Sequence, residues 1–139
     1  MRTAYSCCLI LLLTCGCSPL YQRTGRRVLP LDGTTWQVNV TPDTASAKDG
    51  EKSFNDTLIF DDGKVVMTEC LKYGFGASAY TTSQAGEKWS FKTEQKSPEK
   101  GNSQWSGEIT GESIRGDMSW TKKDGESFHY AFEGKKVEG

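Results

Sequence analysis

The sequence predicts an all-β fold, a small eight-stranded antiparallel up-and-down β-barrel that follows a signal peptide and a short tether. From residue 31 onward, apolar and polar side chains alternate with a period of two, and no window of ten residues keeps the 3.6-residue period of a helix. Turn-forming dipeptides separate the alternating segments. We expect eight strands, at residues 34–41, 55–61, 64–70, 77–82, 87–96, 103–110, 113–122 and 126–133.

The first three strands are indicated by alternation together with one turn. Apolar and polar residues alternate from Trp36 to Val40, which defines the first strand. The second and third strands are joined by Asp62-Gly63, a strong signal for a two-residue hairpin loop. Such a loop pairs Phe60 with Val65, so the turn and the apolar faces select the same register.

The middle strands follow the same logic. A shorter run gives the fourth strand, and the fifth has an apolar face from Trp89 to Thr93 opposite a charged face. Gly111-Glu112 then joins the sixth and seventh strands. As a two-residue loop it pairs Ile109 with Ile114 on the inside, while charged residues of opposite sign face each other outside.

The last hairpin needs a different loop. A two-residue loop at Asp124-Gly125 would turn Phe128 and the aromatic residues after it toward the polar face. A three-residue loop over residues 123–125, with Gly125 in the left-handed conformation, instead pairs Trp120 with Phe128. We predict the three-residue form.

Eight short strands in sequential order can close into a barrel or stack as two sheets, and closure is favoured because it leaves no exposed edge. Gly107 and Gly116 are expected to face each other on the inner side, beneath a large neighbouring side chain. The expected outer face carries charges that exclude a membrane-spanning barrel, namely Lys88, Lys92, Glu94, Glu108, Arg115 and Asp117.

The N-terminal segment predicts export. Arg2, a short apolar run and small residues have the layout of a signal peptide over residues 1–16. The segment resembles lipoprotein signals, which implies that Cys17 is lipidated and becomes the new N-terminus, with Cys15 as the competing site. An ordinary signal peptide before a soluble periplasmic protein is the alternative. Ser18 resembles signals sorted to the outer membrane, so we expect a lipid-anchored protein of the bacterial envelope.

The mature chain then consists of a lipidated cysteine and flexible tether at 17–32, a barrel at 33–135 and a short tail at 136–139. Cys70 is the one cysteine left in the barrel, because three others leave with the signal and Cys17 carries lipid. The barrel therefore has no intramolecular disulfide and is held by packing.

The charge pattern argues against a nucleic-acid partner. The chain carries 17 basic and 18 acidic side chains, and loss of Arg2 shifts the net charge from −1 to about −2. The two signs are interspersed, whereas nucleic-acid binding needs a basic stripe.

Two short motifs carry a resemblance to known families: residues 33–36 (Gly-Thr-Thr-Trp) at the first strand, and residues 105–107 (Trp-Ser-Gly) followed by Trp120 in the late strands. In these motifs the sequence resembles the calycin superfamily: the first is similar to the first strand of lipocalins and avidins, and the second to the late strands of avidin-type barrels. The resemblance implies a lipocalin-like barrel with a ligand mouth at one end.

No residue group predicts catalysis or metal binding. His129 is the single histidine and is expected on the outer face, while zinc sites need three or four ligands. The dipeptide 61–62 (Asp-Asp) precedes a glycine and is typical of a turn. Cys70 is either a redox thiol or a small buried apolar residue, and we favour the second. We expect no enzymatic activity, no cofactor and no metal.

The inward aromatic residues either fill the barrel or line an apolar pocket, since eight strands are just wide enough for their own side chains. A glycine-rich loop carries Tyr73 and Phe75, which with Tyr80 are candidates for a lid over the mouth. The candidate ligand-lining residues are Trp36, Trp89, Trp105, Trp120, Tyr130, Tyr73 and Phe75.

We therefore expect a non-enzymatic envelope lipoprotein, anchored in the membrane through Cys17, whose lipocalin-like barrel binds a small apolar ligand at its mouth. The alternative is a fully packed barrel that acts as a structural module or binds another protein of the cell envelope.

Overall fold

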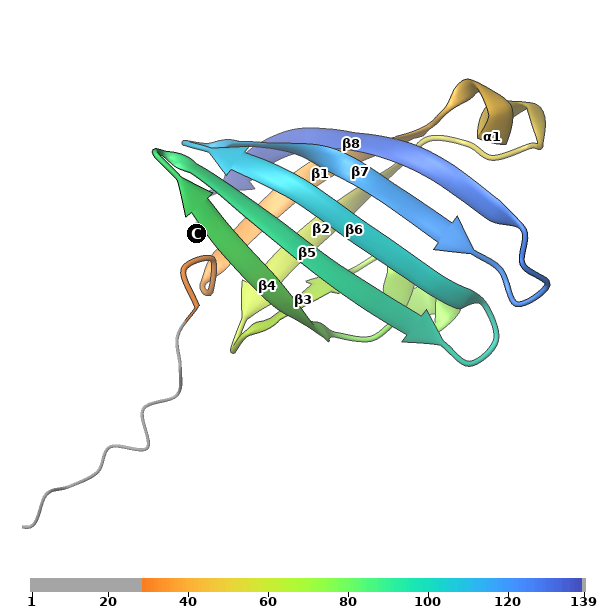
Figure 1. Ribbon diagram of the computed structural model, residues 1–139, viewed down its shortest axis with the longest axis horizontal. Coiled ribbons are helices and arrows are strands. Elements are labelled where there is room, and N and C mark those ends of the chain that lie inside the picture. Colours follow the sequence, from red (N-terminus) through yellow and green to blue (C-terminus); the bar gives the residue numbers. More distant parts are fainter. Residues whose placement is uncertain (1–28, 139) are drawn as a thin grey trace, which may run out of the picture.

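The eight predicted strands form one closed antiparallel sheet in the computed structural model, which describes residues 29–138 (Figure 1). Each strand pairs with the next along the chain, and the last pairs with the first. The predicted up-and-down barrel is thereby confirmed. The strands are β1 (Thr34–Pro42), β2 (Phe54–Asp61), β3 (Lys64–Met67), β4 (Ser78–Ala85), β5 (Lys88–Ser97), β6 (Gly101–Thr110), β7 (Ser113–Thr121) and β8 (Ser127–Val137).

The predicted hairpin registers are confirmed. Phe60 pairs with Val65, and the turn residues Asp62 and Gly63 have φ angles of 52° and 71°, as a type I′ turn requires. Ile109 likewise pairs with Ile114.

The β7–β8 hairpin has the predicted three-residue loop. Trp120 pairs with Phe128, and the loop is closed by a hydrogen bond from the Lys122 N–H to the Glu126 carbonyl at 2.8 Å. Gly125 has a φ of 92°, which a side chain would disfavour. The apolar pattern, rather than the Asp-Gly dipeptide alone, therefore decides this loop.

Most strand ends lie within two residues of the prediction, but β3, β4 and β8 end three or four residues away from it, β4 at Ala85 instead of residue 82. β3 ends at Met67, not at residue 70, because a 3₁₀ helix, η1 (Cys70–Tyr73), follows. A five-residue helix, α1 (Thr44–Lys48), was not predicted and is capped by Asp43, whose carboxylate accepts a hydrogen bond from the Ser46 N–H at 2.7 Å.

β8 is longer than predicted. It continues to Val137, past the expected end at residue 133, because this extension pairs with the start of β1, where Thr35 lies opposite Val137. Two residues that were assigned to a tail thus complete the barrel wall.

The core is aromatic. The aromatic residues at the inward-facing positions of the predicted strands belong to the core or pack against it. They are Trp36, Phe60, Trp89, Phe91, Trp105, Trp120, Phe128, Tyr130 and Phe132. The Phe60 ring packs edge-to-face against Phe91, with ring centroids 5.2 Å apart. Gly107 and Gly116 face each other beneath the Phe132 ring, and a Cβ at Gly116 would lie 2.7 Å from that ring. The two glycines therefore make room for Phe132, as expected.

The barrel has two different ends. At the closed end, three two-residue turns join the strands, and the chain enters and leaves (Figure 1). The entering segment is part of the folded unit, because the Leu31 side chain is buried in the core. At the open end lie the longer connections, at residues 43–53, 68–77, 98–100 and 122–126.

Every strand finds its partners within residues 29–138, and the core lies inside them, so this barrel unit has what it needs to fold by itself. Within the same residues, no helix has the length and apolar character needed to cross a membrane. The predicted signal peptide, Cys15, Cys17 and most of the tether lie outside the described residues.

Candidate functional site

A pocket of about 440 Å³ opens between the loops of the open end. Its apolar walls are Phe54, Phe75, Met118 and Trp120, and Ser103 of β6 lies among its lining residues. We call it the mouth pocket. Its volume falls within the range of about 300–1,000 Å³ that is typical of small-molecule sites.

Trp120 forms a fixed wall of the mouth pocket. Its indole N–H donates a hydrogen bond to the Lys100 carbonyl at 2.7 Å, and its ring packs on Phe128 with centroids 5.5 Å apart. The ring is half-buried, so one part is held by the barrel while another faces the pocket.

The opposite wall is the β3–β4 connection, residues 68–77, which is held by the buried carboxylate of Asp56. One oxygen of this carboxylate accepts hydrogen bonds from the backbone N–H groups of Thr57 and Glu69, at 2.7 Å and 2.9 Å, and from the Thr68 hydroxyl. Burial raises the pKa of Asp56, although these hydrogen bonds oppose the rise. The carboxylate thus acts as an anchor for the loop.

Cys70 completes this anchor. Its buried thiol donates to the other oxygen of Asp56 at 3.5 Å. Burial, followed by the nearby charge of Asp56, raises the pKa of the thiol, so Cys70 stays protonated and is a poor nucleophile. The structure therefore favours the buried structural role over the redox role.

Tyr130 and Glu51 close another side of the mouth pocket. The Tyr130 hydroxyl donates a short hydrogen bond to the Glu51 carboxylate, which reaches over from the β1–β2 connection. Burial raises the pKa of Tyr130, and the hydrogen bond to Glu51 raises it further. The phenol therefore stays neutral at physiological pH.

Four of the seven candidate ligand-lining residues come together here: Tyr73, Phe75, Trp120 and Tyr130. The other three do not line the mouth pocket. Trp36 is buried toward the closed end, where its indole N–H donates to the Thr34 hydroxyl at 2.9 Å. Trp105 is buried in the core, and Trp89 is half-buried near the closed end.

The predicted lid is only partly correct. Tyr80 lies at the closed end, because its hydroxyl donates to the Asp32 carboxylate at 2.7 Å and its backbone N–H donates to the Gly63 carbonyl. Tyr73 and Phe75 do belong to the mouth pocket, but Phe75 is buried in its wall, and Tyr73 alone is exposed at the rim.

The sequence analysis did not predict the buried polar side chains at the open end of the barrel. On the inner face of β5, apolar residues give way to Thr93, Gln95 and Ser97 toward the open end, and Ser103 lies opposite Gln95 on β6. All four are buried. The change from apolar to polar residues at inner positions was the available signal.

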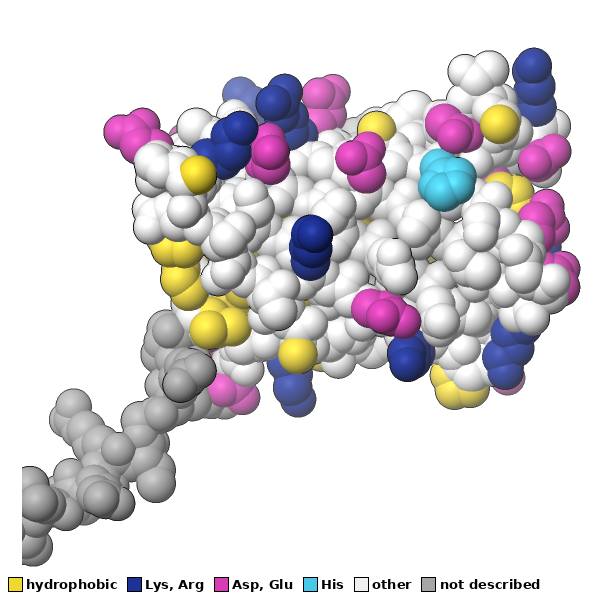
Figure 2. Space-filling model, viewed as in Figure 1, with side chains coloured by type: hydrophobic (Ala, Val, Ile, Leu, Met, Phe, Trp, Pro, Cys, Tyr) yellow, Lys and Arg dark blue, Asp and Glu magenta, His cyan; other side chains and the backbone are white. Residues whose placement is uncertain are grey.

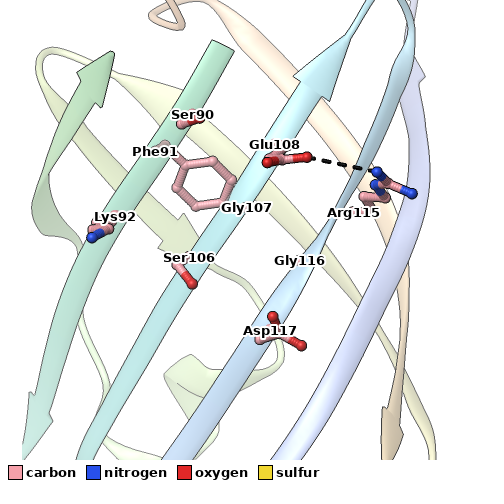
Figure 3. Close-up of a pocket in the computed structure, with 9 residues that line it drawn as sticks. All are labelled: Ser90, Phe91, Lys92, Ser106, Gly107, Glu108, Arg115, Gly116 and Asp117. Carbon is pink, nitrogen blue, oxygen red and sulfur yellow. Dashed lines mark ion pairs between the residues drawn. The ribbon is translucent and has the colours of Figure 1, made fainter. Parts of the chain in front are cut away.

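A second depression, of about 460 Å³, lies on the outer face of β5, β6 and β7 (Figure 3). Its side chains are mainly polar and charged, and Glu108 forms ion pairs with Arg115 at 3.7 Å and with Lys88 at 3.4 Å. These charges are exposed and paired, so the depression is a solvated face of the sheet rather than a ligand site.

The visible surface carries charges of both signs, with His129 on the outer face opposite Ser119 (Figure 2). Within residues 29–138, no three His, Cys, Asp or Glu side chains come together as metal ligands would.

Fold and site together define a small closed β-barrel with a packed core and a pocket at its open end. Such a barrel is consistent with the calycin-like architecture that the sequence resembles. Comparison with models of known protein families finds no match for the chain, and comparison with curated proteins finds none either.

Proposed function

We propose that this protein is a non-enzymatic binding protein of the bacterial envelope, which takes a small, largely apolar ligand into the mouth pocket of a lipocalin-like barrel. The observation that carries the proposal is the pocket itself, which has about 440 Å³ of space between apolar and aromatic walls. Phe60, Phe91 and Trp105 fill the barrel below it, so the ligand is confined to the mouth.

Binding is favoured over catalysis by the state of the titratable groups at the pocket. Glu51 accepts a hydrogen bond from Tyr130, and Glu69 forms an ion pair with Lys72. The thiol of Cys70 is protonated and directed to Asp56. Each group is engaged within the wall rather than poised toward a substrate.

Native mass spectrometry of the protein purified from its source tests the proposal. We expect a co-purifying small molecule with the unmodified chain and with Trp89→Leu, but not with Trp120→Leu. The two tryptophans are matched, because both are half-buried inner-face residues at opposite ends of the barrel. Protein without any added mass, or loss of the mass in both variants, would count against a mouth site.

We further propose that the barrel is anchored to the outer membrane through lipid on Cys17. The chain enters the barrel at the closed end, so the tether would join the barrel at the end opposite the mouth pocket and leave the pocket uncovered. Metabolic labelling with an alkyne fatty acid should label the chain and Cys15→Ser, but not Cys17→Ser. Labelling that persists in Cys17→Ser would show that the lipid is on another residue and would contradict this proposal.

The alternative function, binding of an envelope protein, is favoured by one observation. Leu71 and Tyr73 on η1 are 51% and 56% exposed. Among the described residues, they are the large hydrophobic side chains that are exposed. A photo-crosslinker at Tyr73 in intact cells should capture a partner if this function holds, whereas one at Lys92 on the outer face should not. Equal capture at both positions, or none, would argue against it.

A further inference from the structure

We propose that the floor of the mouth pocket recognises a neutral head group that carries both a hydrogen-bond donor and an acceptor, such as an amide or a lactam, through Ser103 and Gln95. This inference rests on the proposed function, because it names the chemistry of the ligand that would enter the same pocket.

Buried polar atoms without partners lie at and directly below the floor of the mouth pocket. Ser103 lines the pocket, and Gln95 lies opposite it on β5, facing inward below the lining residues; the two are 2% and 0% exposed. Among residues 29–138, three buried side-chain atoms have no hydrogen-bond partner: the Gln95 carbonyl oxygen, the Ser103 hydroxyl and the indole N–H of Trp105, two residues from Ser103 on β6. Buried polar groups are almost always paired, because an unpaired one costs about 1–3 kcal/mol of stability. Because Ser103 lines the pocket and Gln95 lies opposite it, a ligand that reaches Ser103 would bring its polar atoms next to both.

The orientation of the Gln95 amide is fixed. Its Nε2 donates to the Gly76 carbonyl at 3.0 Å. Exchanging the nitrogen and the oxygen would set two acceptors against each other, so Oε1 is the free atom and offers an acceptor. The Ser103 hydroxyl can donate or accept. A head group with one N–H and one carbonyl satisfies both residues.

Ser97, another inner-face serine near the open end, has a structural role and serves as a comparison for Ser103. It is also buried on the inner face of β5, but its hydroxyl donates to the Tyr73 carbonyl at 2.6 Å and accepts from the Lys100 N–H at 3.2 Å. Ser97 therefore holds two loops together. Ser103 makes no such bond in the described part of the chain, although it lines the pocket.

The surroundings favour a neutral head group. Asp56 is the one charged side chain that is buried among the described residues. The two lysines that line the mouth pocket, Lys52 and Lys100, are exposed, so no buried cation of the described residues is present to pair with an anion on Ser103. An anionic head would also meet the Gln95 carbonyl oxygen and pay the cost of burying an unpaired charge. A cation gains little, because both oxygens of Asp56 already accept hydrogen bonds.

The register also places the rest of the ligand. Ser103 lies directly opposite Trp120 on β7, and Trp120, Phe75 and Met118 surround the space above. A head group on Ser103 would leave the ligand body between these side chains. A flat apolar body fits such a wall, since aromatic rings gain most from stacked or edge contacts.

An NMR titration of the ¹⁵N-labelled barrel unit, residues 29–138, with three matched probes tests this inference. The probes are 2-naphthamide, 2-naphthoate and 2-ethylnaphthalene, and the signal is the indole N–H of Trp120. We expect 2-naphthamide to bind about tenfold or more tighter than the other two, the effect of one or two hydrogen bonds. Ser103→Ala should remove most of this preference and leave the affinity for 2-ethylnaphthalene unchanged.

The outcomes separate the two claims. Equal affinity for 2-naphthamide and 2-ethylnaphthalene would overturn the head-group inference and leave an apolar mouth site standing. Tighter binding of 2-naphthoate would overturn the neutral character of the head group. No movement of the Trp120 signal with any probe would overturn both the inference and the proposed ligand site. The comparison of probes on the unmodified barrel does not depend on how well the variant folds.

Discussion

The two ends of the barrel are held by different means. At the closed end, two-residue turns continue the strand pairing to its last residues. At the open end, the connections are longer, and buried side chains hold them: Asp56 fixes the start of the β3–β4 connection, and Gln95 and Ser97 fix its later part. One end is thus a scaffold in which strand pairing continues into the turns and Asp32 ties on the entering segment, whereas the other end is a site whose longer loops are held by buried side chains.

The weakest seam of the sheet lies beside the mouth pocket. β3 and β4 share only the pairs of Lys64 with Ala79 and of Val65 with Ser78, whereas β5 and β6 are paired along their whole length. Beyond these two pairs, residues 68–77 take the place of strand pairing. This wall therefore depends on hydrogen bonds from side chains and is the part of the barrel that can open at the lowest free energy.

The largest effect is expected at the closed end, from Asp32→Ala. The Asp32 carboxylate accepts from the N–H groups of Leu29 and Gly63 and from the Tyr80 hydroxyl, and so ties the entering segment to the β2–β3 turn. Its loss should lower the free energy of unfolding of the whole barrel by about 3 kcal/mol, measured by urea denaturation. A loss below about 0.5 kcal/mol would mean that this end is held by packing alone.

Asp56→Ala should have a smaller and more local effect. Residues 68–77 can release their freed N–H groups to water by opening, so we expect a loss of about 2 kcal/mol, half to two-thirds of that for Asp32→Ala. Hydrogen exchange should rise in residues 68–77 and stay unchanged in β6 and β7. A uniform rise across all strands would contradict the difference between the two ends.

Ser97→Ala and Ser103→Ala are a matched pair within the open end. Ser97 has two hydrogen-bond partners, so its replacement should cost about 1–2 kcal/mol. Ser103→Ala removes a hydroxyl that has no partner among the described residues, and its thermal stability should equal or exceed that of the unmodified protein. Equal losses for both variants would show that Ser103 is structural.

The smallest effect concerns pH. The pKa of Asp56 is raised above its usual value, mainly by burial, so the folded state holds this proton more tightly than the unfolded state does. The contribution of Asp56 to stability should therefore increase as the pH falls through the raised pKa toward the unfolded value. Denaturation of the unmodified protein and of Asp56→Asn, from about pH 7 to about pH 3, should show the difference shifting in favour of the unmodified protein. A shift in the opposite direction would mean that the hydrogen bonds outweigh burial.

The scaffold was predictable from the sequence because the turn residues and the apolar faces agree at two hairpins, and because the apolar faces alone select the loop of the last one. The turn at Asp62-Gly63 and the apolar faces around it select one register, and the same holds at the β6–β7 turn. The end of β3 was not predictable, because Thr68 and Glu69 continue a strand-like pattern and leave it only to bond with Asp56, which is distant in sequence.

The site was predictable only in its aromatic part. Tyr73, Phe75, Trp120 and Tyr130 were candidates because large rings stand out in a sequence. The significance of Ser103 was not visible there, since a serine on a strand is ordinary until its neighbours are known. Ser103 stands out only in the structure, where its buried hydroxyl has no hydrogen-bond partner among the described residues.

The central claim is that the open end of this barrel is a ligand site and the closed end is a scaffold. A high-resolution experimental structure of the protein purified from its source tests it most directly. We predict density for a bound molecule between Trp120 and Phe75, with its polar end on Ser103. A mouth pocket filled by residues 68–77, or density only at the closed end, would contradict the account.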